Sequence, residues 1–377
     1  METPSTRTVQ ALRFYKKGQI QLEQVPTLSC GPDEVRLKVA YCGICGSDIH
    51  EFLGGPIFPP PHGEIHPFTG VKLPVTMGHE FSGTIIQVGS GVNNLKLGQN
   101  VTVNPCLDHR HYQAELCGMC KKGRYNTCDA MTTYGLNAPG GGFCEETAVK
   151  AMNCFVLPPG VSLKAGALAE PLAVAHHCVD ISGFQSGQTA LICGAGPIGL
   201  ALTITLRAMG AAKIIVTEVT ELRMAQAKKF GADVVINPLQ KVDGNETPYT
   251  DPVLAAIYDV TVDGVDVAFD ATGLQSTLDL AIAGVRTGGT IFNVAIHEKP
   301  LLLNLNNLAQ KEKKLMGGIC YTNGDFEAVL RTIAEGKIDV EQMITSIVPL
   351  SNVVDGGFNE LISNKSAHVK ILIQPGQ

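Results

Sequence analysis

Hydrophobic and polar positions alternate with a period of two in the first part of the chain, a pattern typical of short β-strands. Residues 35–41 alternate almost strictly, and residues 8–24 alternate on both sides of Gly18, which predicts a hairpin. Residues 54–69 contain five prolines and three glycines, so they are expected to form an irregular loop. Further strands are expected around residues 83–88, 100–104 and 140–149. This part therefore predicts an all-β sheet or barrel.

From residue 187 onward, short apolar runs alternate with segments of helical composition, which predicts a parallel sheet with helices on both faces. The expected strands are residues 190–193, 213–217, 233–236, 265–270 and 290–294, and the helices between them are 198–209, 221–230 and 275–283. A further helix is expected before this region, at residues 165–181. After residue 315 we expect helices at 326–335 and 357–363 and strands at 345–349 and 368–373. The fold class is thus α/β: a Rossmann domain (178–319) is inserted into a β-rich domain built from residues 1–177 and 320–377.

The composition fits a compact globular enzyme and narrows its partners. Of 377 residues, 45% are hydrophobic and 17% are charged, which argues against a disordered chain. The net charge of −6 argues against nucleic acid or an anionic membrane as a partner. Residues 1–18 hold no apolar run of a secretory signal, and no stretch is long enough to span a bilayer. The twelve cysteines are therefore expected to be reduced thiols or metal ligands in the cytoplasm.

A glycine motif opens the alternating region. Gly194, Gly196 and Gly199 stand in G-x-G-x-x-G spacing between an apolar run and a helical segment, which predicts a turn that cradles a pyrophosphate at a helix N-terminus. Glu218 ends the next apolar run, where a carboxylate accepts hydrogen bonds from ribose hydroxyls and repels a 2′-phosphate. This favours NAD over NADP, although the nearby Arg223 weakens the inference. The alternatives are a glycine turn without a ligand and a surface glutamate.

Three residues far apart in the sequence could hold a catalytic zinc. Cys45, His79 and Glu170 offer a thiolate, an imidazole and a carboxylate, and Glu80 lies next to His79. Three such ligands leave a fourth zinc position open for substrate. Because the spacing is not local, each residue could equally be a buried or hydrogen-bonded structural side chain.

Ser47 and His50 follow Cys45 within one short segment. A hydroxyl beside a bound alcohol, followed by an imidazole, could carry a proton to solvent. The alternative is that Ser47 caps a helix starting near Asp48 and that His50 is simply exposed.

Four cysteines gather in a polar segment, residues 105–130. The spacing Cys117-x-x-Cys120 followed by Cys128 is typical of zinc ligands, and Cys106 completes a tetrahedral set. A site with four protein ligands has no open position, so its role would be structural. Two alternatives stay open: disulfides, or a site in which His109 or His111 replaces a cysteine.

The ordered motifs resemble the zinc-dependent medium-chain dehydrogenase/reductase superfamily over nearly the whole chain. They are CGICGSDIH at 42–50, GHEFSG at 78–83, the cysteine cluster, GGGF at 140–143, AEPL at 169–172 and GAGPIG at 194–199. The Glu-Pro-Leu motif is similar to the polyol and butanediol dehydrogenase branch, because the horse-liver and yeast alcohol dehydrogenases carry cysteine there. Residues 51–58 and 181–184 resemble the fungal (R,R)-butane-2,3-diol dehydrogenases.

This resemblance implies a GroES-like β-rich catalytic domain and assigns roles to the candidate residues. Cys45, His79 and Glu170 would bind the catalytic zinc, and Glu80 would move on and off it. Ser47 and His50 would form the proton relay. The structural-zinc motif usually reads C-x2-C-x2-C-x7-C, but here residues 107–116 separate Cys106 from the other three cysteines. The implied cofactor-binding residues are Gly194, Gly196, Pro197, Ile198, Gly199, Glu218, Arg223, Thr272, Val294, Gly318 and Ile319.

The resemblance further implies a zinc- and NAD-dependent oxidoreductase. It would transfer hydride between a small secondary alcohol, vicinal diol or polyol and its ketone, with butane-2,3-diol and acetoin as the first candidates. A sorbitol- or xylitol-type polyol dehydrogenase and a biosynthetic alcohol dehydrogenase are alternatives within this class. A non-catalytic dinucleotide-binding protein is the alternative outside it. A homo-oligomer, dimer or tetramer, is also implied.

Overall fold

The computed structural model describes residues 7–240, 251–297 and 299–376 and divides the chain into two units. Unit 1 comprises Met1–Glu170 and Thr322–Gln377, and unit 2 comprises Pro171–Tyr321. The first boundary lies at the start of α4 (Ala169–Ile181), whereas the predicted boundary at residue 177 falls inside that helix. Residues 1–6, at the start of the segment without an apolar run, lie outside the described residues. Within the described ranges, no helix has both the length and the apolar character needed to cross a membrane.

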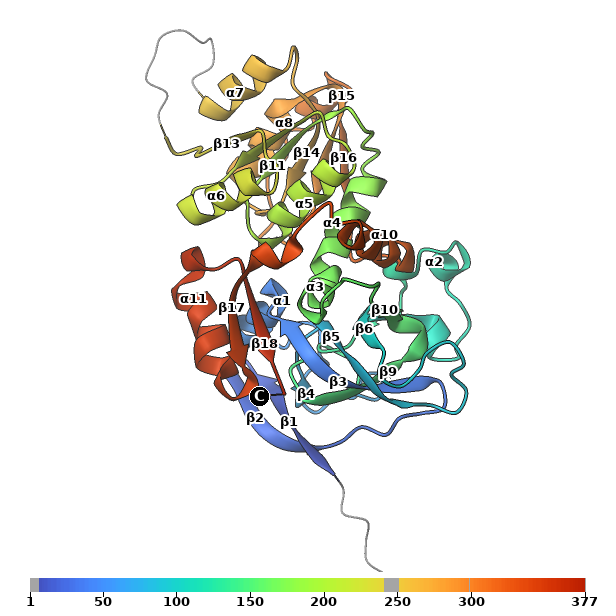
Figure 1. Cartoon of the computed structure of the whole chain (residues 1–377). Helices are drawn as coiled ribbons and strands as arrows, with labels where there is room; N and C mark the ends of the chain where they lie inside the picture. The colour runs from blue at the N-terminus through green and yellow to red at the C-terminus, as the bar shows by residue number, and fades with distance from the viewer. Residues whose placement is uncertain (1–6, 241–250, 298, 377) are drawn as a thin grey trace, which may run out of the picture. The chain divides into compact units, whose positions relative to one another are not determined.

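Unit 1 is built on a seven-stranded sheet in the order β10-β6-β5-β3-β18-β17, with β9 also paired to β3 (Figure 1). Its strands are β3 (Glu34–Gly43), β5 (Glu80–Val88), β6 (Asn100–Val103), β9 (Glu146–Lys150), β10 (Cys154–Val156), β17 (Ile344–Pro349) and β18 (Lys370–Gln374). The expected hairpin, β1 (Thr8–Lys16) and β2 (Gln19–Pro26), joins β4 (Val75–Thr76) in a separate three-stranded sheet. The two-stranded sheet of β7 (Cys106–Leu107) and β8 (Thr132–Thr133) completes the unit.

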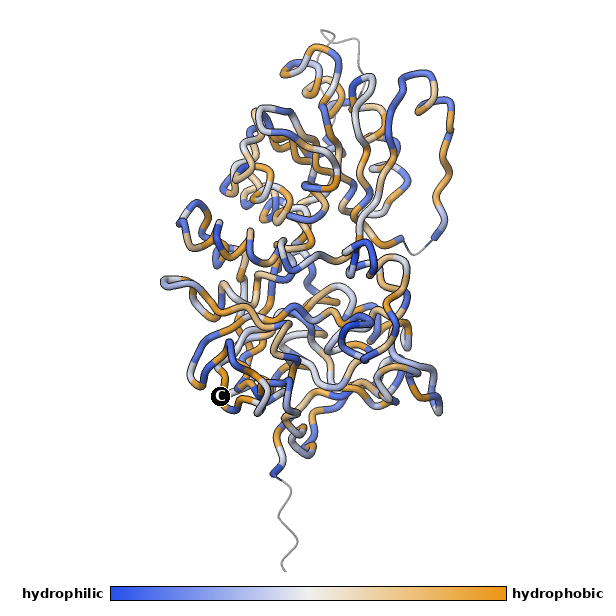
Figure 2. The backbone as a smooth tube through the Cα atoms, turned by 90° about the vertical axis from the view of Figure 1, so that its right-hand side faces the viewer, coloured by the Kyte–Doolittle hydropathy of each residue, from blue (hydrophilic) through white to orange (hydrophobic). Residues whose placement is uncertain are grey.

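The period of two in β3 places one face of the strand in the core. Val35, Leu37 and Val39 are buried, while Lys38 points to solvent. In Figure 2 such alternation appears as short orange and blue segments along the tube. β3 pairs on one side with β5 and on the other with β18, so the C-terminal strand lies beside the N-terminal ones.

Unit 2 is a six-stranded parallel sheet in the order β13-β12-β11-β14-β15-β16, flanked by helices (Figure 1). The strands are β11 (Thr189–Cys193), β12 (Lys213–Thr217), β13 (Val234–Ile236), β14 (Val265–Asp270), β15 (Val285–Asn293) and β16 (Lys314–Gly317). The helices are α5 (Pro197–Ala208), α6 (Glu221–Lys229), α7 (Pro252–Val260), α8 (Gln275–Gly284) and α9 (Asn306–Ala309). This is the strand order of a Rossmann fold, and its central strands are continuous apolar runs because both faces are covered.

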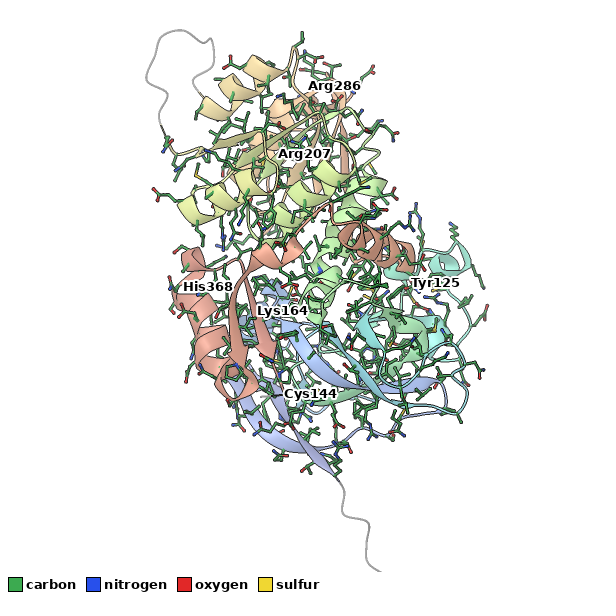
Figure 3. All side chains as sticks on the ribbon, in the orientation of Figure 1. Tyr125, Cys144, Lys164, Arg207, Arg286 and His368 are labelled. Carbon is green, nitrogen blue, oxygen red and sulfur yellow. The ribbon has the colours of Figure 1, made fainter. Side chains whose placement is uncertain are left out.

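Two arginines tie elements of this sheet together (Figure 3). The Arg286 guanidinium, on β15, donates through Nε to Asp266 Oδ1 at 2.7 Å, on β14. Arg207, near the end of α5, donates to Asp233 Oδ2 at 2.6 Å, just before β13. Both links join neighbouring elements, so they support the order of the strands.

Several elements differ from the predicted ones. The segment that contains Ser47 and His50 is a helix, α1 (Gly46–Gly54), which the sequence offered only as an alternative and which starts at a capping box of Cys45 and Asp48. The helix expected at 165–181 is two helices, α3 (Leu163–Ala167) and α4. The strand expected at 140–149 is shorter in the structure, where β9 begins only at Glu146. The remaining helices are α2 (Gly118–Lys121), α10 (Asn323–Ala334) and α11 (Glu360–Ser363), the last following a π-helical segment at Val353–Asn359.

Candidate functional site

The first cluster in unit 1 brings together Cys45, His79 and Glu80, whose ligand atoms all lie within 4.8 Å of one another. Cys45 follows β3 and caps α1, and the two other residues stand at the start of β5. The pairing of Gly43 with Glu80 between β3 and β5 places both segments side by side. The register of this sheet therefore assembles a group from residues more than thirty positions apart.

Gly43 leaves the room that the Glu80 carboxylate occupies. A Cβ atom at position 43 would lie 2.1 Å from Glu80 Oε2. Any larger residue would displace this carboxylate, so glycine is required here by packing and not by backbone conformation.

The two ring nitrogens of His79 face different neighbours. Nδ1 lies 3.6 Å from Asp48 Oδ1, and Nε2 lies 3.2 Å from Ser47 Oγ. Burial lowers the pKa of His79, but the negative charges of Asp48 and Cys45 outweigh burial and hold that pKa well above its ordinary value. An imidazole oriented by a buried carboxylate is a common arrangement of a metal-binding histidine.

A buried lysine neutralises Glu80. Lys370 Nζ, at the start of β18, donates to the two Glu80 carboxylate oxygens at 2.6 and 2.8 Å and to the Ile44 carbonyl at 3.2 Å. Burial lowers the pKa of Lys370, yet the carboxylate of Glu80 raises it above its ordinary value. The negative charges of Cys45 and Glu170 also raise the pKa of Lys370.

The residues of the first cluster fit a zinc ion. Thiolate, imidazole and carboxylate donors are those that zinc takes, and His79 Nδ1 and Asp48 Oδ1 are buried atoms without a hydrogen-bond partner among the described residues. The structure brings Glu80 into the group of three, whereas the predicted third ligand, Glu170, lies outside that group and is buried near Lys370. The ligand role of Glu170 stays a prediction.

Ser47 and His50 both belong to α1, so Ser47 is inside the helix and does not cap it. Their spacing of three residues puts them on the same helix face. Ser47 Oγ contacts the ring nitrogen of His79 that Asp48 does not face. The hydroxyl is therefore held at the edge of the cluster, next to the polar end of α1.

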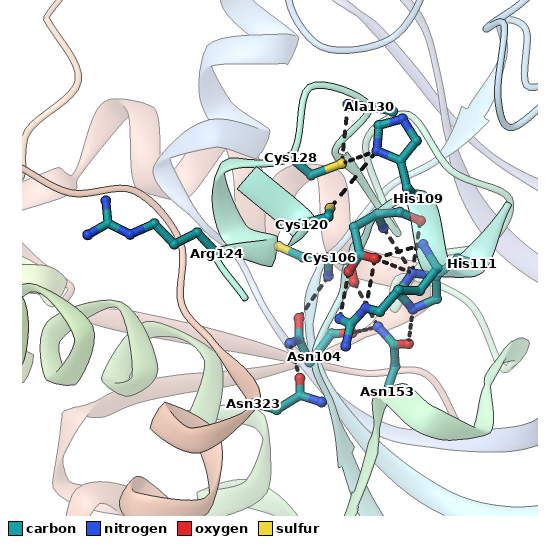
Figure 4. Close-up of polar contacts among 12 residues, drawn as sticks. Asn104, Cys106, His109, His111, Cys120, Arg124, Cys128, Ala130, Asn153 and Asn323 are labelled. Carbon is teal, nitrogen blue, oxygen red and sulfur yellow. Dashed lines mark hydrogen bonds and ion pairs between the residues drawn. The ribbon is translucent and has the colours of Figure 1, made fainter. Parts of the chain in front are cut away.

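The second cluster contains His109, Cys117, Cys120 and Cys128, with all four ligand atoms within 4.8 Å of one another. His109 Nδ1 lies 2.9 Å from Cys128 Sγ and 4.0 Å from Cys120 Sγ (Figure 4). The predicted set has Cys106 where the structure has His109. The insertion predicted to interrupt the motif forms a short turn, His109–His111, that brings the imidazole to the cysteines. Burial and the neighbouring thiols of Cys128 and Cys117 raise the pKa of Cys120.

In unit 2, the strand ends line up at one edge of the parallel sheet. Cys193 pairs with Thr217 and Asp270, and Asn293 pairs with Asp270 and Gly317. The predicted cofactor-binding residues directly follow these strand ends; they include Gly194, Glu218, Thr272, Val294, Gly318 and Ile319. The carboxyl edge of such a sheet is where dinucleotides bind.

The three glycines of the motif play different parts in the turn. A Cβ at Gly199 would lie 1.9 Å from the Gly194 carbonyl oxygen, and Gly194 has a φ of 97°. Gly196 caps α5 with an ordinary φ of −65°, and a Cβ there would meet no atom within 4 Å. Neither conformation nor protein packing demands glycine at 196. The open space in front of it fits a pyrophosphate at the N-terminus of α5, where Pro197 and Ile198 begin the helix.

Glu218 is buried, and its carboxylate bonds to backbone N–H groups at this edge. Its Oε2 accepts from Ala195 at 2.9 Å, and its Oε1 accepts from Val219 at 2.8 Å and Thr220 at 2.9 Å. The carboxylate thus links the glycine turn to the end of β12. Arg223 lies on α6, one turn further along the chain.

Sequence reasoning missed the roles of Asp48 and Lys370 and preferred Cys106 to His109. Asp48 could have been found from its place three residues after Cys45, which is capping-box spacing. Lys370 carries no signal except a charge at the start of an otherwise apolar strand. His109 was left as an alternative because spacing alone does not show which histidine of the insertion turns inward.

The chain is similar to zinc-binding dehydrogenases in both sequence and fold. Residues 31–159 match the family model "Alcohol dehydrogenase GroES-like domain", and residues 197–335 match "Zinc-binding dehydrogenase". An (R,R)-butanediol dehydrogenase of Saccharomyces cerevisiae is 36% identical over 384 residues, covering 97% of this chain and 98% of that protein. The crystal structure of 2R,3R-butanediol dehydrogenase from Bacillus subtilis is 37% identical, with a TM-score of 0.87 over 98% of this chain and 100% of that one. A zinc-binding dehydrogenase from Sinorhizobium meliloti bound to NADP is 28% identical, with a TM-score of 0.84 over 98% of this chain and 100% of that one.

Replacing Lys370 by Met should destabilise the protein by about 3–5 kcal/mol, because Glu80 would stay buried without its partner. Urea denaturation measures this change in the free energy of unfolding. The double variant Lys370→Met/Glu80→Gln should recover part of the loss, since the two residues act as a unit. Lys38→Met, on the exposed face of β3, is the matched control and should be nearly neutral. A neutral Lys370→Met would contradict the role of the ion pair.

Two alanine variants of the glycine motif should have different effects, one mainly on NAD affinity and the other mainly on stability. Gly196→Ala should cost about 1 kcal/mol or less of stability, as a poorer helix cap, yet weaken NAD binding about tenfold or more by filling the pyrophosphate space. Gly199→Ala should lower the thermal midpoint clearly, because its methyl group meets backbone. Calorimetric titration and thermal melts measure the two effects. Unchanged NAD affinity in Gly196→Ala would show that the space serves no ligand.

Proposed function

Because the chain belongs to the zinc-dependent medium-chain dehydrogenase/reductase family, we propose that it interconverts butane-2,3-diol and acetoin with NAD as the hydride acceptor. The two matching family models are those of alcohol dehydrogenases and zinc-binding dehydrogenases, and structural neighbours were solved with NADP and with NADH. The observation that carries the proposal is that one chain holds both the Cys45–His79–Glu80 cluster and the glycine turn of a dinucleotide site. The diol is chosen because relatives at 36–38% identity bear butanediol dehydrogenase names.

The reaction converts a secondary alcohol and NAD⁺ into a ketone, NADH and a proton. When bound, zinc lowers the pKa of an alcohol hydroxyl and the nicotinamide takes the hydride. Cys45 and His79 would hold the metal, with Glu170 as the predicted third ligand. Lys370 holds the Glu80 carboxylate by two hydrogen bonds, and any movement of Glu80 onto the metal must break them.

Ser47 and His50 would carry the released proton. The Ser47 hydroxyl stands at the His79 edge of the cluster, where it can accept a hydrogen bond from a substrate hydroxyl. His50 lies on the same face of α1 and is partly exposed, so its imidazole can pass the proton to solvent. Ser47 would take the proton from the substrate hydroxyl and His50 would release it to solvent, with a bound nicotinamide ribose as the link that the family resemblance implies.

The preference for NAD rests on Glu218. Its carboxylate is buried beside the glycine turn, so a 2′-phosphate on the adenosine ribose would meet a negative charge. This argues for NAD although one structural neighbour was solved with NADP. We place the reaction in the cytoplasm, because the cysteine ligands must stay reduced to bind metal.

The function is tested by turnover of butane-2,3-diol with NAD and NADP in parallel, against sorbitol, xylitol and simple secondary alcohols. We expect the highest kcat/KM for butane-2,3-diol with NAD. Cys45→Ala should lose about a thousandfold or more in kcat/KM, as expected when a Lewis acid is removed, but should still bind NAD. Cys30→Ala, half-buried outside both clusters, is the control. No turnover of any of these substrates would contradict the proposal.

A second copy of this chain is the proposed partner. The edge strand β16 has all four residues exposed, among them Leu315 at 40% and Met316 at 37%. Leu302, at 84%, and Leu305, at 66%, precede it. Two β16 edges can pair antiparallel about a two-fold axis, which extends the sheet and covers these side chains.

Light scattering should therefore give a dimer or tetramer for the native protein. Leu315→Glu should shift it toward monomer, because a carboxylate on the paired edge would be buried against its symmetry mate. Leu239→Glu, at a position 77% exposed beyond the opposite edge strand β13, should leave the assembly unchanged. A native monomer would contradict the proposed pairing.

A further inference from the structure

We propose that the second metal site of this chain is a Cys₃His site, in which His109 is the fourth ligand and Cys106 stays outside the coordination sphere. This departs from the four-cysteine set that the family resemblance implies. It concerns the lobe formed by residues 105–130 and does not depend on the substrate proposed above.

The donor atoms already stand close to zinc geometry. A tetrahedral ion with Zn–S bonds of 2.3 Å and Zn–N bonds of 2.0–2.1 Å separates its donors by about 3.5–3.8 Å. His109 Nδ1 lies 2.9 Å from Cys128 Sγ and 4.0 Å from Cys120 Sγ, and Cys117 Sγ completes a group within 4.8 Å. Shifts of about 1 Å or less bring these distances to the expected values.

The insertion between Cys106 and Cys117 is built to present His109. The Asp108 carboxylate accepts hydrogen bonds from Arg110 N at 3.0 Å and Arg110 Nε at 2.8 Å, which closes the turn on both sides of His109. The Arg110 guanidinium lies over the Tyr125 ring at 3.4 Å. His111 points elsewhere, with Nε2 at 2.7 Å from Asn153 Oδ1. His111 thus bonds to Asn153, whereas His109 faces the cysteines.

An aromatic side chain from the proline-rich loop covers the imidazole. The Phe68 ring meets the His109 ring edge-on, with centroids 5.7 Å apart, and stacks on Tyr112 at 5.4 Å. The buried apolar core of the lobe is small and consists of Cys120, Cys128 and Ala130. A metal ion would therefore supply much of the stability of this lobe.

Cys106 belongs to the strand beneath the lobe. Its backbone N–H donates to Asn104 Oδ1 at 2.9 Å, and its carbonyl accepts from Asn153 Nδ2 at 2.8 Å (Figure 4). It pairs with Thr133 in the β7–β8 sheet, so its backbone is bound on both edges. Its sulfur does not belong to the group of four ligand atoms.

The test measures zinc per chain in the full-length protein carrying Cys45→Ala, so that the remaining zinc reports on the second cluster. We expect one zinc in this background and one after adding Cys106→Ser. Adding His109→Ala or Cys117→Ser should lose that zinc. His111→Ala is the matched control, because it removes a histidine of the same turn and should keep the metal.

Cobalt substitution gives a second readout that does not depend on stability. The Co²⁺ spectrum of the Cys45→Ala protein should indicate three thiolates and one nitrogen, be unchanged by Cys106→Ser, and shift to a four-thiolate spectrum in His109→Cys. Far-UV circular dichroism identifies variants that fail to fold. If His109→Ala is one of them, the Co²⁺ spectrum of His109→Cys decides whether residue 109 is a ligand. Loss of zinc in Cys106→Ser with retention in His109→Ala, or a four-thiolate spectrum before any change at 109, would overturn the proposal.

Discussion

The ion pair between Lys370 and Glu80 is the constraint on which the first cluster depends. Both side chains are almost fully buried, and an ammonium and a carboxylate out of water are stable only together. The lysine comes from the last strand of the chain and the glutamate from β5, with β3 between them. The cluster therefore forms only when the C-terminal segment has returned to the sheet of unit 1.

The two clusters of unit 1 combine similar side chains for different chemistry. The first has three candidate ligands, a serine hydroxyl at its edge and a carboxylate already held by a lysine, so an open metal position can coexist with a proton path. The second has four candidate ligands and an aromatic cover, so a metal bound by all four would have no position for substrate. The first set of residues suits the catalysis proposed above, and a metal in the second would fasten a lobe whose own apolar core is small.

Unit 2 places several loops at one edge of its parallel sheet. The parallel strands end in register, so the residues after them converge although they are spread over more than a hundred positions. Gly199 permits the tight approach to Gly194, and Gly196 leaves space that the protein itself does not fill. Glu218 then ties the turn to β12 through three backbone N–H groups.

Local patterns were enough to predict the hairpin at Gly18, the alternation of β3 and the strands and helices around the glycine motif, because period and turn chemistry act over a few residues. They gave α1 only as an alternative, because glycines weaken the helical pattern and the cap formed by Cys45 and Asp48 is seen only in the structure. The resemblance implied Cys45, His79 and Glu170 as ligands of one zinc ion, which stays a prediction. Only the tertiary structure set Lys370 against Glu80 and turned His109, in place of Cys106, toward the cysteines. A charge or an imidazole finds its partner by packing between distant segments, and spacing along the chain does not encode that.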